Sequence, residues 1–126
     1  MSTDTDTDTD TAARGQDLAV EHLQRLGYAT LARNYRTRHG VIDVVAHTER
    51  TIVFVEVTTR RGPVASVAAF TDPSPSHQLK ARRMARAWLA EAAGRPRVPQ
   101  LRFDGVGIAV DDAGAVVDLA HLEDCF

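Results

Sequence analysis

The chain has 126 residues, of which 44% are hydrophobic and 25% are charged, and its formal net charge is −2. These values are typical of one soluble globular domain. The single cysteine, Cys125, excludes an intramolecular disulfide and a cysteine-based zinc site, and it fits a reducing compartment. Because no apolar run approaches the roughly 18 residues of a membrane span, and no apolar signal-peptide core is found at the N-terminus, we expect a cytoplasmic protein without a membrane partner.

An acidic tail opens the sequence. Residues 1–13 carry four aspartates and no basic residue. Their alternating Thr and Asp residues offer little apolar surface whose burial could offset the entropy of ordering. We therefore predict a disordered tail over residues 1–13 and a folded domain over residues 14–126.

The first predicted element is a helix that starts near Arg14. Its apolar positions follow helical spacing, and Gly27 supplies the left-handed residue at which helices often stop. The residues that make up this stripe are Leu18, Ala19, His22, Leu23 and Leu26.

Three strands are expected next, over residues 28–34, 41–47 and 51–58. The segment RTRHG, which ends at Gly40, predicts a turn between the first two strands, and the polar residues 48–50 predict a hairpin before the third. The third strand is the most apolar, so we place it at the centre of the sheet.

The second half of the chain alternates loop, helix and strands. Residues 60–75 contain three prolines and predict a long mobile loop. A helix is expected over residues 76–93, followed by strands over 101–110 and 115–119. The order α-β-β-β-α-β-β predicts an α/β domain in which helices flank a mixed sheet of about five strands.

Two carboxylates lie within apolar strands. Glu56 is surrounded by Val and Phe residues in the third strand, and Asp43 lies among valines in the second. A buried charge is costly unless it is paired or binds a metal. Acids on adjacent strands can converge and hold one Mg²⁺ through one or two carboxylates. The alternative is that each acid forms an ion pair with an arginine at the edge of the sheet.

The middle of the chain is basic. Residues 33–97 hold twelve Lys or Arg against five Asp or Glu, and fourteen of the fifteen basic residues in the chain are arginine. The planar guanidinium suits phosphate, so this surplus favours a nucleic-acid partner, although a solvated basic face has the same composition. The predicted phosphate contacts are Arg36, Arg38, Arg60, Lys80, Arg83 and Arg86.

The histidines give a weaker signal. His39 and His47 flank the second strand, and His77 begins the second long helix. Their spacing matches no metal-binding signature, so we interpret all three as surface residues. Trp88 is predicted to lie in the core.

These segments together resemble the YraN-like family, bacterial proteins of uncharacterised role that have the restriction-endonuclease-like, or PD-(D/E)xK, fold. The resemblance covers residues 14–126 and rests on the order and spacing of short motifs. The motifs are G-Q-D-L-A at 15–19, L-G-Y at 26–28, N-Y-R at 34–36, G-V-I-D-V-V-A at 40–46, V-F-V-E-V at 53–57, T-R at 59–60, Lys80, R-F-D at 102–104 and Phe126.

The resemblance implies a nuclease-type site. Asp43 matches the family's aspartate and Glu56 its glutamate, and both are implied as ligands of Mg²⁺ or Mn²⁺. The metal would activate water for in-line attack on a phosphodiester. Gln16 and Thr58 would line this site.

Three positions depart from the family's pattern. Thr58 stands in place of the catalytic lysine, Val41 in place of a glutamate before Asp43, and Gln16 in place of a glutamate in the first helix. A hydroxyl cannot stabilise developing negative charge as an ammonium does, so these changes predict impaired or lost catalysis. Lys80 is the only lysine in the chain, and it could supply the missing ammonium from its helix.

Two functions are therefore predicted from the sequence. The first is a metal-dependent endonuclease-like protein that binds nucleic acid, with DNA favoured over RNA. The second is a non-catalytic nucleic-acid-binding or protein-interaction module on the same fold. The sequence makes no prediction about the oligomeric state.

Overall fold

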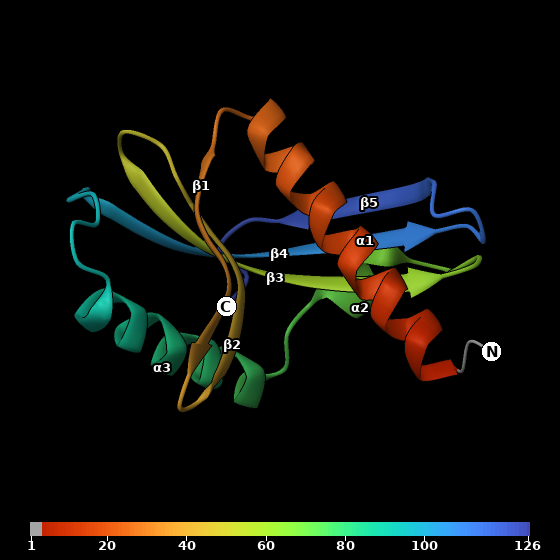
Figure 1. Cartoon of the computed structure of the whole chain (residues 1–126), viewed down its shortest axis with the longest axis horizontal. Helices are drawn as coiled ribbons and strands as arrows, with labels where there is room; N and C mark the ends of the chain where they lie inside the picture. The colour runs from red at the N-terminus through yellow and green to blue at the C-terminus, as the bar shows by residue number, and fades with distance from the viewer. Residues whose placement is uncertain (1–3) are drawn as a thin grey trace.

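The computed structural model describes residues 4–126, with side chains from Asp10 onward. Over this range it contains three helices and five strands, and the predicted order holds, with one short helix added before the second long one (Figure 1). The elements are α1 (Asp4–Arg25), β1 (Ala29–Thr37), β2 (Gly40–His47), β3 (Thr51–Arg61), α2 (Val67–Thr71), α3 (Pro75–Glu91), β4 (Gln100–Val110) and β5 (Val116–Leu122).

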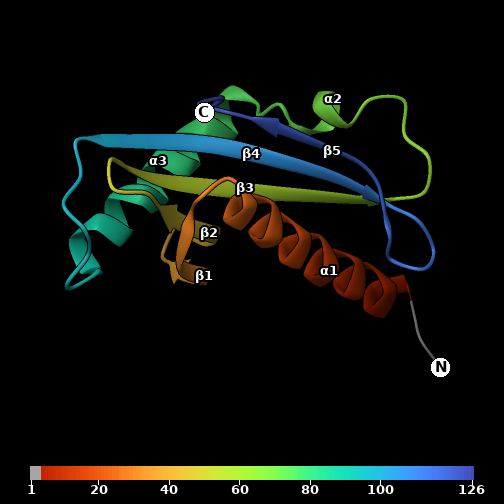
Figure 2. The same cartoon turned by 90° about the horizontal axis from the view of Figure 1, so that it is seen from above.

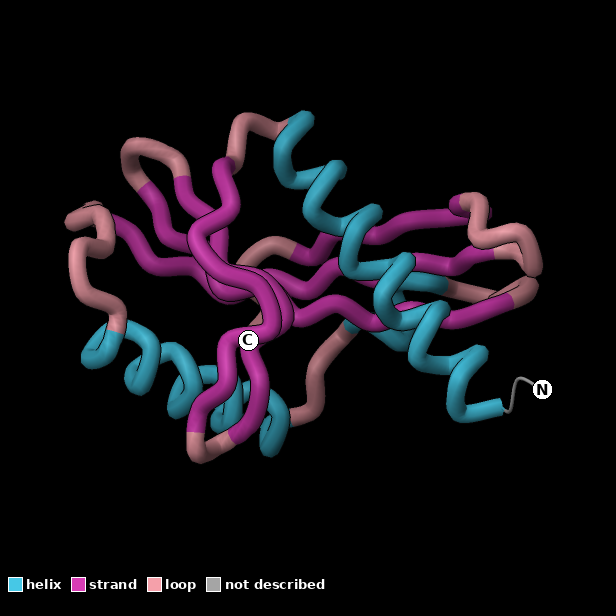
Figure 3. The backbone as a smooth tube through the Cα atoms, in the orientation of Figure 1, coloured by secondary structure: helices cyan, strands magenta, loops and turns pink. Residues whose placement is uncertain are grey.

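The five strands form one mixed sheet in the order β1-β2-β3-β4-β5. β3 pairs with β4 in parallel, and every other pair is antiparallel. The most apolar strand is therefore the central one, as predicted. The parallel pair needs a crossover, which α2 and α3 provide (Figure 3).

α1 begins at Asp4 and not near Arg14, so residues 4–13, predicted as a disordered tail, are helical in the structure. A contact distant in sequence explains the difference. Thr11 is buried, and its Oγ1 accepts a hydrogen bond of 2.9 Å from Nη2 of Arg61 at the end of β3. The helix thus gains packing that its own composition does not reveal. Residues 1–3 of the predicted tail lie outside the described residues.

The two long helices pack on opposite faces of the sheet, as the side-chain alternation of β3 predicts. α1 buries Leu18, Ala19 and Leu23 against one face, which includes Val53 and Val55. On the other face a second core is formed by Ile42, Val45, Ile52, Phe54, Ala85, Trp88, Phe103 and Phe126. Figure 2 shows α1 on one side of the sheet and α2 on the other.

The predicted loop over residues 60–75 is partly regular. β3 extends to Arg61, and α2 starts after the N-cap Ser66, whose side chain accepts a hydrogen bond from the backbone of Ala69. α2 packs so closely on β4 that Gly107 has no room for a side chain: an added Cβ would lie 1.7 Å from Oγ1 of Thr71. In the described range no helix is both long and apolar enough to cross a membrane.

The β1–β2 hairpin leaves the sheet halfway along its length. β2 pairs with β3 only from Val44 to His47, and at Asp43 the ladder stops. There the Oδ2 atom of Asp43 accepts a hydrogen bond of 2.8 Å from the backbone N–H of Val57. Figure 1 shows the hairpin crossing the direction of β3 and β4 steeply, with its turn beside α3. This departure opens the space in which the candidate site lies.

Candidate functional site

A small cavity of about 120 Å³ lies between the end of the hairpin, β3 and α3. Four ionisable side chains from three different elements line it. They are Asp43, Glu56, His77 and Lys80. The structure therefore brings together three of the predicted site residues, Asp43, Glu56 and Lys80, and adds one histidine that the sequence analysis assigned to the surface.

Aromatic rings form the apolar wall of this cavity. Phe54 stacks on Phe103 with ring centroids 5.4 Å apart, and Phe126 is buried beside them. The end of the chain is held in place by Arg82, whose Nη2 donates to the backbone oxygen of Phe126 at 2.6 Å. The carboxylates therefore face a wall of low polarity, which strengthens every electrostatic interaction within the cavity.

Burial and mutual repulsion act on the two carboxylates. Burial raises the pKa of Asp43, and the backbone N–H of Val57 and the nearby His77 only partly oppose this. Burial also raises the pKa of Glu56, His77 lowers it, and the charge of Asp43 raises it further. Both carboxylates therefore hold a proton more tightly than a free Asp or Glu does.

His77 pairs directly with Glu56. Its Nε2 lies 2.9 Å from Oε1 of Glu56. The position follows from the helix start, because Ser74 caps α3 and accepts a hydrogen bond from the backbone N–H of His77. A capped first turn aims residue 77 towards the end of β3. The Ser-Pro start of the helix was visible in the sequence, but its direction relative to β3 was not.

Lys80 follows His77 on α3 and reaches into the same cavity. Its aliphatic part lies over Gly40, where an added Cβ would be 2.8 Å from Lys80 Cε. Gly40 has φ of 140°, a conformation that other residues rarely adopt. The charge of Lys80 lowers the pKa of Glu56, so the ammonium and the carboxylate interact electrostatically.

Thr58 does not line this cavity. It is partly buried on the same strand face as Glu56 and lies in register with Gly107 of β4. Gly107 is covered by α2, since an added Cβ would lie 3.0 Å from Val67. Position 58 is therefore next to α2 and outside the lining of the cavity.

Gln16 approaches Asp43 from the opposite face. It is buried on α1, and Gln16, Asn34 and Asp43 line a second hollow of about 350 Å³. The Gln16 amide donates to Oδ1 of Asn34 at 2.8 Å and accepts from Nε of Arg33 at 2.9 Å. Asn34 has φ of 52°, and it lies opposite Asp43 where the hairpin bends. Gln16 thus supports the bend that carries Asp43.

The side chains of the cavity include two carboxylates, too few for a site in which protein ligands surround a metal ion completely. Among the residues with described side chains, no group of three or more His, Cys, Asp or Glu is arranged to hold a metal ion. Mg²⁺ usually binds through one or two carboxylates and keeps several waters, whereas structural zinc needs four protein ligands. Asp43 and Glu56 are therefore the two side chains of this cavity that could hold Mg²⁺ or Mn²⁺.

Three of the predicted phosphate contacts converge on a groove next to the cavity. Arg38 from the β1–β2 turn and Arg83 and Arg86 from α3 line this groove, which has a volume of about 580 Å³. Arg36 is exposed on β1. Arg60 lies elsewhere, with its guanidinium 5.2 Å from the ring centre of Phe70. Of the six predicted contacts, three therefore line the groove, Lys80 lines the cavity beside it, and Arg36 and Arg60 line neither.

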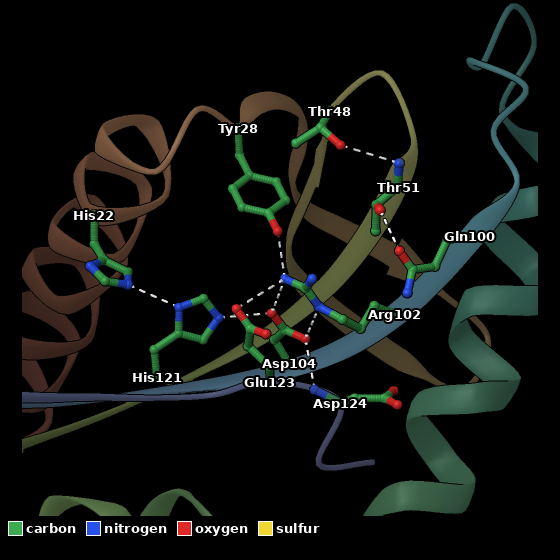
Figure 4. Close-up of polar contacts among 10 residues, drawn as sticks. All are labelled: His22, Tyr28, Thr48, Thr51, Gln100, Arg102, Asp104, His121, Glu123 and Asp124. Atoms are coloured by element: carbon green, nitrogen blue, oxygen red, sulfur yellow. Dashed lines mark hydrogen bonds and ion pairs between the residues drawn. The ribbon is translucent and has the colours of Figure 1, made fainter.

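A separate polar network is buried on the α1 face, and Figure 4 shows its members. Asp104 is completely buried. Its carboxylate accepts from Nε and Nη2 of Arg102 at 2.9 and 2.8 Å, from the His121 ring at 2.7 Å and from the Asp124 backbone at 3.0 Å. The pairing of Asp104 with an arginine agrees with the spacing of R-F-D, which places both residues on one strand face.

The network continues to α1. His121 Nδ1 lies 2.9 Å from Nε2 of His22, and Arg102 also donates to the hydroxyl of Tyr28 at 2.6 Å. The sequence analysis placed His22 only in the apolar stripe of the first helix, and no local signal pairs residues 99 positions apart. These contacts join α1 to the C-terminal half of the sheet.

Comparison with known proteins identifies close relatives. A sequence model of the family described as "Uncharacterised protein family UPF0102" matches residues 15–108. A UPF0102 protein of Mycolicibacterium vanbaalenii is 42% identical over 93 residues, which cover 73% of this chain and 75% of the relative. A UPF0102 protein of Mycolicibacterium smegmatis is 42% identical over 101 residues, covering 78% of both chains. One of Acidothermus cellulolyticus is 40% identical over 107 residues, covering 75% of this chain and 76% of the relative.

Proposed function

The chain belongs to the UPF0102 family, in agreement with its resemblance to YraN-like proteins, and we propose that it is a metal-dependent nuclease with the restriction-endonuclease-like fold. The observation that carries this proposal is the convergence of Asp43, Glu56 and Lys80 in one cavity. Two acids with an ammonium beside them are the groups that phosphodiester hydrolysis needs when a metal ion is used.

Asp43 and Glu56 would hold the metal from two strands that separate at this point. Once bound, Mg²⁺ would lower the pKa of a water molecule and neutralise charge on the phosphate. The low-polarity wall that includes Phe54 and Phe126 limits competing water and strengthens these interactions.

Lys80 would take the role of the lysine that Thr58 replaces. Its ammonium stabilises negative charge on the phosphate oxygens and would act from α3 instead of β3. His77 holds Oε1 of Glu56 and so keeps that carboxylate in the cavity. His77 would have to move or share this oxygen when a cation binds, so we assign it a positioning role.

The test is cleavage of branched, single-stranded and duplex DNA with Mg²⁺ or Mn²⁺. We expect wild-type protein to cleave at least one of these substrates, and Lys80→Ala to lose at least tenfold in rate. Arg97→Ala, which removes an exposed positive charge on the loop after α3, is the matched control and should retain the rate. Equal rates for wild type and Lys80→Ala would exclude a catalytic role for Lys80.

A second function is favoured by a specific contact. In the structure Glu56 is already paired with His77, and no lysine follows it on β3. This pattern fits a module that keeps the fold and binds nucleic acid without cleaving it. Calorimetry with Mg²⁺ and Mn²⁺ separates the two functions. Millimolar or tighter binding that is lost in both Asp43→Ala and Glu56→Ala supports the nuclease, and an absence of binding in wild type supports the module.

A further inference from the structure

We propose that the groove lined by Arg38, Arg83 and Arg86 holds the backbone phosphates of one nucleic-acid strand as it leaves the cavity along α3. The direction of the strand rests on the proposed function, which places a phosphodiester in the cavity. The binding of phosphates by the groove does not depend on catalysis and is tested without it.

The charges of this groove are available to a ligand. Arg83 and Arg86 are three residues apart on α3 and therefore share one helix face, with Arg38 opposite them on the hairpin turn. Within the described part of the chain none of these three guanidinium groups forms an ion pair. The internal contact of Arg38 is a hydrogen bond of 3.3 Å to the ring of His39. Three unpaired guanidinium groups facing one groove favour a polyanion.

The groove lies beside the cavity along two elements, α3 and the hairpin. On α3, Lys80 lines the cavity and Arg83, one turn later, lines the groove. On the hairpin, His39 lines the groove and the next residue, Gly40, is covered by Lys80. A strand with one phosphate in the cavity would therefore find the next phosphates between these two elements.

The length of the groove sets the number of phosphates. Arg86 lies six positions after Lys80, which corresponds to about 9 Å along a helix axis at 1.5 Å per residue. A stacked strand carries one charge per roughly 3.4 Å, so two to three phosphates fit beside the one in the cavity. Glu91 lines the far end, where it accepts a hydrogen bond of 2.6 Å from the hydroxyl of Tyr35. Its negative charge repels a further phosphate and ends the binding site.

The first experiment measures binding of fluorescent single-stranded DNA in EDTA across a series of salt concentrations. The test variant is Arg38→Ala/Arg83→Ala/Arg86→Ala. The control variant, Arg25→Ala/Arg50→Ala/Arg97→Ala, removes the same charge from exposed positions outside the groove. Each phosphate contact on a single strand contributes roughly 0.7 to the slope of log K against log salt, so the test variant should lower the slope by about 2. An equal loss in the control variant would mean diffuse attraction and would overturn the proposal.

The second experiment varies the length of the DNA. Wild-type affinity should rise as nucleotides are added and stop rising once about three phosphates extend beyond the cavity, and this dependence should be weaker in the test variant. If the test variant lowers the salt dependence of binding in EDTA more than the control variant does, but wild type never cleaves DNA, the groove proposal stands and the nuclease proposal fails. If wild type cleaves while the test variant binds DNA as tightly as wild type, the groove proposal fails and the nuclease proposal stands. Circular dichroism confirms that both triple variants are folded.

Discussion

Replacement of Asp104 by Asn should destabilise this protein more than any surface substitution. Asp104 is completely buried, and its two oxygens accept four hydrogen bonds from Arg102, His121 and the Asp124 backbone. The Asn side chain has nearly the same shape but replaces one accepting oxygen with an NH₂ group. That group then faces N–H donors, and the positive charge of Arg102 loses its buried partner and keeps only the exposed Glu123 at 3.8 Å.

The magnitude follows from these contacts. If the NH₂ group takes the place of Oδ2, the bonds from His121 at 2.7 Å and from Nη2 of Arg102 at 2.8 Å are lost. Hydrogen bonds to charged groups contribute about 1.5–3 kcal/mol each, and removing one partner of a buried ion pair costs about 3–5 kcal/mol. We therefore expect a loss of about 3–5 kcal/mol, against a total of about 5–15 kcal/mol for a domain.

Urea unfolding followed by circular dichroism measures this loss. Asp112→Asn, at an exposed position in the β4–β5 turn, is the control and should change the free energy of unfolding by less than about 0.5 kcal/mol. A loss below about 1 kcal/mol for Asp104→Asn would show that the network contributes little to stability, and would refute this reasoning.

The pH dependence gives the same prediction a second readout. Burial raises the pKa of Asp104, but the hydrogen bonds from His121 and Arg102 outweigh it and lower the pKa below the ordinary value of 3.8. Because the folded-state pKa is lowered, the stabilisation is fully present above pH 3.8 and is lost as the pH falls through the folded value. The difference between wild type and Asp104→Asn should therefore be constant near neutral pH and shrink in acid.

Three further predictions concern other contacts. Gly15→Ala should destabilise by about 1–3 kcal/mol in urea unfolding, because an added Cβ would lie 1.8 Å from Oγ1 of Thr59, and addition of Thr59→Ala should recover part of the loss. The pKa of His22 is lowered from 6.5 by burial and by the charges of His121 and Arg25. The free energy of unfolding of wild type should therefore fall as the pH drops from 6.5 through the folded-state pKa. His22→Gln should show a flatter dependence of stability on pH over that window. Asp43→Asn should raise the thermal unfolding midpoint in EDTA, because it removes a carboxylate charge that burial disfavours. The same change should abolish any stabilisation by added Mg²⁺. A lower midpoint than wild type in EDTA would contradict this expectation.

The sheet could be predicted from the sequence because the alternation of side chains along a strand shows which residues face each side. The alternation in β3 separates Val53 and Val55 from Ile52 and Phe54, and the structure buries these two sets in different cores. Glycines and prolines mark the ends of the helices. The helix before Arg14 could not be predicted, because a contact that holds this segment, between Thr11 and Arg61, joins residues 50 positions apart.

The candidate site was only partly predictable for the same reason. Two acids in apolar strands are visible as a pattern, and both lie in the cavity. The partner of Glu56 is not visible in this way, because His77 reaches it through the path of the crossover and the cap of α3. The partners of Asp104 were likewise only partly predictable from the sequence. Arg102 lies two residues away and could be inferred, but His121 and His22 come from separate elements.

The position of the lysine follows from how β2 leaves β3. Residues that share a strand face do not necessarily share a site, because the cavity opens only where the hairpin departs, beside Asp43 and Glu56. Two residues further along β3, Thr58 lies next to Gly107, which α2 covers. α3 instead runs along the open side, and Lys80 extends from it over Gly40. In this arrangement the helix, and not the strand, is the element from which an ammonium enters the cavity that both carboxylates line.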